Sequence, residues 1–187
     1  KVCLLVGIVS VAVAAGIGVP LGMVSGMVRG WPGEIPARLA DILYGFPALL
    51  LAILFAAALG GSTWTAMMAI ALASIPAFVR IARAATLQVM SQGYVEAARL
   101  SGTPHLAVAW RHVLPNIAPI VGVQLSVSIG IAILAEAGLS YLGLGSGPET
   151  PTWGRMLREA QTYIFNAPLL ALWPGLAIAV ATMGFNL

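Results

Sequence analysis

The sequence predicts an all-α, polytopic membrane protein, and three of its features carry that prediction. Of the 187 residues, 60% are hydrophobic and 8% are charged, whereas soluble domains carry about 25% charged residues. The mean hydropathy of +0.98 means that the apolar surface is too large to be hidden in a soluble core of this size. The apolar residues also gather in runs of about 20, the length of helix that crosses the hydrocarbon of a bilayer.

Five stretches are long and apolar enough to span a membrane: residues 2–28, 41–60, 63–83, 117–138 and 168–187. No polar lead precedes the first of them, and no closing tail follows the last. We therefore expect one transmembrane domain over residues 1–187, trimmed at both ends from a longer chain. The first stretch is too long for the apolar core of a secretory signal and lacks an evident cleavage site, so we interpret it as a true span.

Positive charge predicts the orientation, because cytoplasmic segments of membrane proteins are enriched in lysine and arginine. The side that holds the segments 29–40 and 84–116 carries most of these residues, namely Arg29, Arg38, Arg80, Arg83, Arg99 and Arg111. The opposite side keeps only Lys1, Arg155 and Arg158. We therefore expect 84–116 to be cytoplasmic and the segment 139–167 to be external. The net charge of +3 rests on few residues and gives no indication of nucleic-acid binding.

Small residues recur at every fourth position of the first span: Ser10, Ala14, Gly18, Gly22, Gly26 and Gly30. Helices in lipid associate by close backbone approach, so this ridge predicts a packing face against the same chain or another. Prolines recur as well, at Pro47, Pro76, Pro119 and Pro174. Each removes a backbone hydrogen bond, and the pattern fits both a gating hinge and a tolerated bend.

The segment 84–116 is too polar to span the membrane and too regularly patterned to be disordered. A helix is predicted over 91–101, with Gly102 as its left-handed C-cap. A second short helix is predicted over 104–112, because the proline at its start prevents simple continuation of the first. Pro115 is then expected in the first turn of the next span, where its missing N–H costs nothing.

The residue types in the first of these helices suit contact with another protein. Ala97 and Ala98 leave a low surface on which a partner can sit closely. Glu96 offers a carboxylate to a basic group, while Arg99 and Arg111 can pair with acidic groups. An interfacial helix on lipid headgroups is the alternative, although the segment lacks a wide apolar face with basic residues opposite.

The run Glu96-Ala97-Ala98, followed by Gly102 and Leu114-Pro115, resembles the EAA loop in permease subunits of ATP-binding-cassette importers of the type I fold. In that family the loop forms a coupling helix seated in a groove of the cytoplasmic ATPase subunit. The resemblance implies a role in ATPase coupling for Tyr94, Glu96, Ala97, Ala98, Arg99, Gly102, His112, Leu114 and Pro115. The usual pattern has isoleucine where this chain has His112. The form Arg-His-Val-Leu-Pro-Asn instead resembles the branch that serves dipeptides, oligopeptides and nickel.

Other stretches resemble the same branch in the right order, among them Asp41-Ile42, Phe46 to Ala52, and residues 136–145 and 151–157. The resemblance implies the type I importer fold in the cell inner membrane, with five of six spans visible. The implied partners are a second permease subunit, two cytoplasmic ATP-binding subunits, an extracytoplasmic solute-binding protein and membrane lipid, with no nucleic acid. The implied activity is ATP-driven import of di- or oligopeptides, with nickel or another small solute as the alternative.

The external segment and the span before it carry the second group of candidate residues: Glu136, Ser140, Tyr141, Gly143 and Trp153. Glycines at 143, 145 and 147 predict a flexible turn, and a short helix is expected over 156–165. Trp153 and Tyr163 suit a water–lipid interface. The segment either receives a solute-binding protein or plugs the outer end of the pathway. We expect Glu136 to accept hydrogen bonds from the glycine-rich backbone after it, ahead of a substrate contact, since a carboxylate there is costly without a partner.

The sequence disfavours several other activities. The glycine spacing at 143–147 lacks the lysine and the strand–helix context of a phosphate-binding loop, so we expect no cofactor in this chain. His105 and His112 have no carboxylate ligand between them, which favours surface histidines over a metal site. No nucleophile elbow is visible, so the chain is not expected to be an enzyme. An ion-coupled secondary transporter is the alternative from composition, but such carriers place ionisable groups near mid-membrane, and the span interiors here are almost free of charge.

Overall fold

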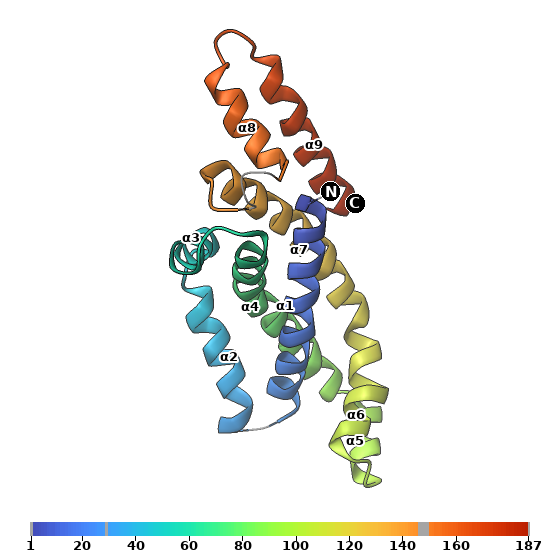
Figure 1. The fold of residues 1–187 in the computed structure, drawn as a ribbon. Coiled ribbons are helices and arrows are strands. Elements are labelled where there is room, and N and C mark those ends of the chain that lie inside the picture. Colours follow the sequence, from blue (N-terminus) through green and yellow to red (C-terminus); the bar gives the residue numbers. More distant parts are fainter. Residues whose placement is uncertain (1, 29, 146–149, 187) are drawn as a thin grey trace. The chain divides into compact units, whose positions relative to one another are not determined.

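The computed structural model describes residues 2–28, 30–145 and 150–186, and its regular structure in these residues is helical (Figure 1). The elements are α1 (Val2–Met27), α2 (Trp31–Tyr44), α3 (Ala48–Leu59), α4 (Thr63–Met90), α5 (Gly93–Leu100), α6 (His105–Val108), the π-helical turn η1 (Ala109–Val113), α7 (Leu114–Leu142), α8 (Trp153–Thr162) and α9 (Leu169–Asn186). The predicted all-α class is confirmed. The expectations for Lys1, Arg29, Gly147 and Leu187 lie outside the described residues.

The chain forms two compact units, which we describe separately. The first unit contains Lys1–Val13, Phe46–Ser74 and Ser126–Leu187, and the second contains Ala14–Gly45 and Ile75–Leu125. The long helices α1, α4 and α7 each contribute one part to either unit. The candidate coupling residues therefore belong to the second unit, and the candidate residues of the external segment belong to the first.

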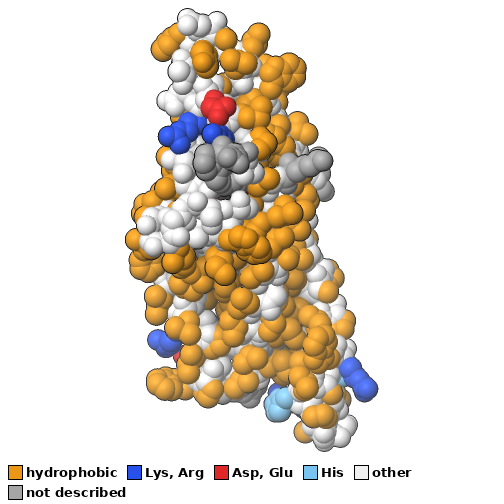
Figure 2. Space-filling view, in the orientation of Figure 1, with side chains coloured by type: hydrophobic (Ala, Val, Ile, Leu, Met, Phe, Trp, Pro, Cys, Tyr) orange, Lys and Arg blue, Asp and Glu red, His pale blue; other side chains and the backbone are white. Residues whose placement is uncertain are grey.

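Within the described residues, four helices are long and apolar enough to cross a membrane. They are Val2–Met27, Thr63–Met90, Leu169–Asn186 and His105–Leu142, in which α6, η1 and α7 follow one another without a break. Large apolar side chains on these helices are exposed, including Leu5, Ile131 and Val180. Figure 2 shows hydrophobic side chains over most of the face in view. These surfaces fit contact with lipid and support a polytopic membrane protein.

The stretch 41–60 is not the single helix that we expected. Helix α2 ends at Tyr44, and Pro47 is the N-cap of α3 with φ −56° and ψ 124°. Proline disfavours the helical conformation in the residue before it, so the chain leaves one helix and begins another. The 12 residues of α3 would extend about 18 Å, less than the roughly 30 Å of the hydrocarbon. The other three prolines noted above end no helix, since Pro76, Pro119 and Pro174 lie inside α4, α7 and α9.

The segment between α4 and α7 is also more helical than expected. Helix α4 continues to Met90 instead of ending near residue 83. The helix expected over 104–112 is not separate, because α6 and η1 join α7, and Pro115 lies inside the combined helix instead of in a first turn. The N–H of Leu114 donates to the carbonyl of Ala109 in η1. This wider π turn relieves the clash between a proline ring and the carbonyl of the preceding turn.

The ridge of small residues on α1 packs against α4 of the same chain, which answers the question that the sequence left open. A Cβ atom placed on three of the glycines would lie only 2.6–2.7 Å from another Cβ atom, in the pairs Gly18–Phe78, Gly22–Ala82 and Gly26–Thr86. Ser10 on the same ridge donates from its hydroxyl to the carbonyl of Met67 at 3.0 Å. Gly30 does not belong to the packing face: its φ is 87°, and no described atom lies within 4 Å of its Cβ position.

Candidate functional site

Helix α5 is a short helix held by one fully buried side chain. Val95 is 0% exposed. The other candidate residues of α5 are accessible: Tyr94, Glu96, Ala97 and Arg99 are exposed, and Ala98 is half-buried. Glu96 lies in the first turn and Arg99 in the last, which is the arrangement of charge that a helix dipole favours. The helix therefore presents small and charged side chains to its surroundings while Val95 anchors it.

Helix α5 ends at Gly102, which is the left-handed C-cap that the sequence predicted, and the structure shows that the cap is a Schellman motif. The φ angle of Gly102 is 81°. The N–H of Thr103 donates to the carbonyl of Ala98 at 3.1 Å, and the N–H of Gly102 donates to that of Arg99 at 3.0 Å. These two bonds define the motif. No described atom lies within 4 Å of a Cβ placed on Gly102, so the turn requires the backbone freedom of glycine and not its small size.

The remaining candidate coupling residues lie where α5 meets the helix His105–Leu142, beside α6 in Figure 1. The rings of Tyr94 and His112 are 6.0 Å apart between centroids, with their planes at 55°. This tilted ring contact connects α5 to η1. Leu114 is half-buried and Pro115 is exposed. The structure thus brings together Tyr94 and His112, a contact that the sequence did not predict.

Sequence reasoning missed three large apolar side chains in this region. Leu100 is 84% exposed, Leu106 71% and Trp110 64%. Leu100 ends α5, and Leu106 and Trp110 lie in the first two turns of the helix His105–Leu142. Large exposed apolar side chains at these positions are typical of a surface that another molecule covers. The signal was present in the sequence, because large apolar residues stood in a segment that was expected to lie outside the bilayer.

Glu136 lies in a buried polar cluster of the first unit. Its side chain is 0% exposed, and its Oε1 accepts a hydrogen bond of 2.6 Å from the Ser140 hydroxyl. Its Oε2 has no hydrogen-bond partner among the described residues. The prediction that Glu136 accepts hydrogen bonds from the glycine-rich backbone after it is wrong. Helix α7 continues to Leu142, so the nearby N–H groups are already bonded within the helix.

The glycine-rich turn after α7 is a defined cap and not the flexible turn that we expected. Gly143 has a φ of 81°, and its N–H donates to the carbonyl of Ser140 at 3.1 Å, while the N–H of Leu144 donates to that of Leu139 at 2.9 Å. This is a second Schellman motif. A Cβ placed on Gly143 would overlap the guanidinium of Arg158. The turn is therefore packed under a side chain of α8.

Helix α8 begins at Trp153 and ends at Thr162, so the helix expected over 156–165 lies further toward the N-terminus. Its start is set by Thr152, whose Oγ1 accepts from the N–H of Arg155 at 3.2 Å. Trp153 is half-buried. The hydroxyl of Tyr141 lies 2.8 Å from Oε1 of Gln161 and donates to it. Helices α8 and α9 lie side by side in Figure 1.

In the part of the chain that the structure describes, no group of three histidine, cysteine, aspartate or glutamate side chains could hold a metal ion. His105 is exposed and His112 half-buried. The candidate residues thus form an exposed contact surface on α5 and a buried polar cluster around Glu136.

The chain is similar to membrane components of transport systems in its sequence and in its fold. Residues 18–187 match the family model described as "Binding-protein-dependent transport system inner membrane component". The whole chain is 40% identical to the glutathione transport system permease protein GsiD of Pectobacterium atrosepticum and 39% identical to that of Escherichia coli O1:K1. The chain spans 62% of the length of these relatives.

The fold is similar to a solved structure of the MetNI methionine ABC transporter in an inward-facing conformation, with a TM-score of 0.80. The match covers 98% of this chain and 88% of that chain. Sequence identity over this match is 17%, so the likeness concerns the fold alone.

Proposed function

Because the chain belongs to the family of binding-protein-dependent transport system inner membrane components, we propose that it acts as the permease subunit of an ATP-driven importer of peptides. Its resemblance to type I importer permeases is confirmed by the family match, the GsiD relatives and the shared fold. The chain is an inner-membrane transport component and not an enzyme. ATP is bound and hydrolysed by separate subunits, and the chain itself needs no cofactor.

The observation that carries the proposal is the form of α5. Val95 anchors the helix while Glu96 and Ala97 face outward, and Gly102 ends it in a defined cap. A small, exposed helix of this kind can be seated in a groove of an ATP-binding subunit, with the carboxylate of Glu96 available for pairing with a basic group there. The contact between Tyr94 and His112 would transmit movement of α5 to the long helix that follows.

The proposed assembly contains a second permease subunit, two ATP-binding subunits and an extracytoplasmic solute-binding protein. ATP binding would close the two ATP-binding subunits and draw the coupling helices together, so that the spans alternate between inward and outward access. The α8 region would face the binding protein, since it lies in the segment assigned to the external side. This mechanism rests on analogy with the family.

Peptides are the first choice of substrate. The relatives at 39–40% identity are named as glutathione transport permeases, and glutathione is a small peptide. Nickel or another small solute is the alternative. Much of the selectivity would reside in the solute-binding protein. Reconstitution of the complex with its binding protein, followed by uptake of glutathione, dipeptides and Ni²⁺ in parallel, decides between them.

Cross-linking tests the docking of α5. The lone cysteine, Cys3, is buried and would first be replaced by alanine. Glu96→Cys and Ala97→Cys are expected to cross-link to the ATP-binding subunit in the assembled complex. Tyr163→Cys, on an exposed residue of the external segment, is the control and should not cross-link to it.

Two results would overturn the proposal. The first is a complex that transports in response to ATP while neither α5 cysteine ever cross-links to the ATP-binding subunit. The second is solute uptake in liposomes that follows an ion gradient without any ATPase, which would favour an ion-coupled carrier.

A further inference from the structure

Two neighbouring cavities in the second unit have opposite chemistry and share part of their lining. The larger has a volume of about 530 Å³ and is lined mainly by apolar side chains, among them Val24, Val28 and Leu106; we call it the apolar groove. Its volume lies within the range of about 300–1,000 Å³ that is usual for ligand sites. The smaller, of about 270 Å³, is lined by Arg83 and other polar residues; we call it the polar pocket. Met27, Val28 and Arg99 line both.

The polar pocket contains a guanidinium that the protein leaves incompletely bonded. The Nε atom of Arg83 is buried and has no hydrogen-bond partner in the described part of the chain. None of the ion pairs formed by described residues includes Arg83 or Arg99, whereas Arg38 and Arg80 each pair with a carboxylate. No carboxylate among the described residues neutralises these two guanidinium groups, so an anion placed in this pocket would be stabilised by both.

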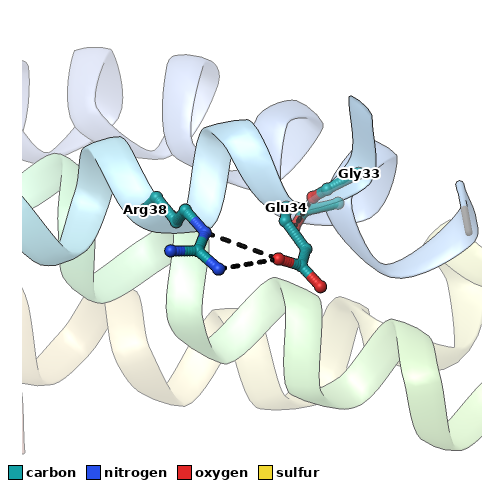
Figure 3. Close-up of polar contacts among 4 residues, drawn as sticks. Gly33, Glu34 and Arg38 are labelled. Atoms are coloured by element: carbon teal, nitrogen blue, oxygen red, sulfur yellow. Dashed lines mark hydrogen bonds and ion pairs between the residues drawn. The ribbon is translucent and has the colours of Figure 1, made fainter. Parts of the chain in front are cut away.

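The other polar groups of the pocket do not compete for this role. Glu34 is the acidic residue of its lining, and its Oε2 is engaged by Arg38 through Nη2 at 3.1 Å and Nε at 3.4 Å (Figure 3). The hydroxyls of Ser25 and Ser91 donate to backbone carbonyls at 2.5 and 2.8 Å. Arg83 and Arg99 are therefore the donors that suit an anion.

We propose that the two cavities form one binding site for an anionic phospholipid of the cytoplasmic leaflet. Its phosphate would lie against Arg83 and Arg99, and one of its acyl chains would fill the apolar groove. Val24, Met27 and Arg83 lie toward the C-terminal ends of α1 and α4, which the charge distribution assigns to the cytoplasmic side. Basic pockets between helices at that face attract anionic headgroups.

The chemistry of the two cavities selects this ligand over simpler anions. Inorganic phosphate would satisfy the arginines and leave the apolar groove empty. A carboxylate from a protein partner would do the same. Only an amphipathic anion satisfies both cavities at once. Because Arg99 belongs to α5, a bound lipid would also hold the end of α5 close to the end of α1, so that lipid composition would influence coupling.

Lipid retention tests the proposal on the assembled complex extracted into lipid nanodiscs made from native membrane. Phosphatidylglycerol, cardiolipin and phosphatidylethanolamine that remain bound would be counted by mass spectrometry. Arg83→Gln is expected to reduce the retained anionic lipid about fivefold, the effect of one arginine near a membrane surface. Arg80→Gln removes the same charge from an exposed residue that lines neither cavity and pairs with Asp41, which lines neither cavity as well, and it should leave retention unchanged.

A second pair of variants tests the apolar groove. Val24→Trp would fill the groove and should also lower retention of anionic lipid, whereas Ile17→Trp, on an exposed residue of α1 outside the groove, should not. Addition of millimolar inorganic phosphate to the wild-type complex should not release the lipid. The proposal is overturned by equal retention in Arg83→Gln and wild type, by equal losses in Arg83→Gln and Arg80→Gln, or by full displacement with phosphate. It is also overturned if a photoreactive group at Val24 labels the ATP-binding subunit and no lipid.

Discussion

Two turns of this protein share one backbone conformation and differ in their surroundings. Gly102 and Gly143 both have a φ of 81°, and each closes a Schellman motif after a helix. A Cβ on Gly102 would meet no described atom within 4 Å, whereas one on Gly143 would overlap the guanidinium of Arg158. The cap after α5 therefore depends on backbone conformation alone. The cap after α7 depends on conformation and on space.

The difference extends to the residues around each turn. Near Gly102, the side chains of Leu100 and Trp110 are 84% and 64% exposed, as in a surface that another protein covers. Near Gly143, polar side chains are paired within the chain: Ser140 donates to Glu136, and Tyr141 bonds with Gln161. We infer that substitutions around Gly102 mainly affect activity in the complex. Substitutions around Gly143 should mainly affect stability.

Gly143→Ala is expected to give the largest loss of stability. The left-handed conformation costs a residue with a Cβ about 1–2 kcal/mol. The guanidinium of Arg158, the far end of an exposed and flexible side chain, must also move aside, which adds a small further cost. Gly102→Ala should cost only the left-handed conformation, so its loss should be slightly smaller. Thermal unfolding of the purified complex, followed by loss of the monodisperse peak in size-exclusion chromatography, measures both.

The control for this pair is Gly122→Ala, because Gly122 lies inside α7 with no described atom within 4 Å of its Cβ position. Alanine at a helical site is about 0.5–1 kcal/mol more favourable than glycine, so the melting temperature should not fall. A larger loss for Gly102→Ala than for Gly143→Ala would contradict the role given to Arg158.

Ala97→Trp should lower the substrate-stimulated ATPase activity of the complex and leave the stability of the fold nearly unchanged. Ala97 is exposed on α5, so the fold accommodates a larger side chain, but a docked partner does not. An overpacked contact of about 1–3 kcal/mol corresponds to a loss of coupling of roughly 5- to 150-fold. Substrate-stimulated ATPase activity of the reconstituted complex measures it. Ala118→Trp, on an exposed residue of α7 outside the coupling segment, is the control, and normal stimulation in Ala97→Trp would contradict docking on α5.

Ser140→Ala should destabilise the first unit without any contact to a partner. It removes the donor to Oε1 of Glu136, which is buried at 0% exposure. A buried polar group left without its partner costs about 1–3 kcal/mol. Ser126→Ala, on an exposed residue of the same helix, should have little effect. In a Glu136→Met background the cost of Ser140→Ala should nearly vanish, and an unchanged cost there would show that the hydroxyl serves something other than Glu136.

Features that depend on the local sequence, such as a helix cap, were predicted well. Features that depend on packing against residues distant in the sequence were not. Gly102 was predicted correctly, because a glycine after a short polar helix needs nothing beyond its own backbone to form a cap. The ridge on α1 was recognised from Gly18 and Gly22, but its partner α4 was left open, since spacing along one helix does not identify the neighbour. The buried state of Val95 and the exposure of Leu100 follow from packing, which periodicity over eight residues does not resolve.

The errors come from prolines and helix ends. Pro47 starts a new helix, while Pro115 lies within one, although each follows a large apolar residue, Phe46 and Leu114. The π turn that accommodates Pro115 has no sequence signal of its own. The predicted hydrogen-bond donor to Glu136 was wrong for a related reason. Helix α7 extends to Leu142, so the backbone N–H groups that were expected to be free bond within the helix. The donor to Glu136 is instead the side chain of Ser140.

The smallest effect is expected at the ion pair between α2 and α4 in the second unit. Nη2 of Arg80 lies 2.6 Å from Oδ1 of Asp41, with side chains 49% and 57% exposed, and the Arg80 guanidinium also lies 4.3 Å from the ring centroid of Tyr44. An exposed pair contributes about 0.2–1 kcal/mol, and an exposed cation–π contact about 0.5–1 kcal/mol.

Asp41→Asn removes only the ion pair, whereas Arg80→Gln removes both interactions and should lower the melting temperature further. Salt screens exposed pairs, so at high ionic strength the cost of Asp41→Asn should vanish while part of the cost of Arg80→Gln persists. Equal costs for both variants at every salt concentration would mean that Tyr44 contributes nothing.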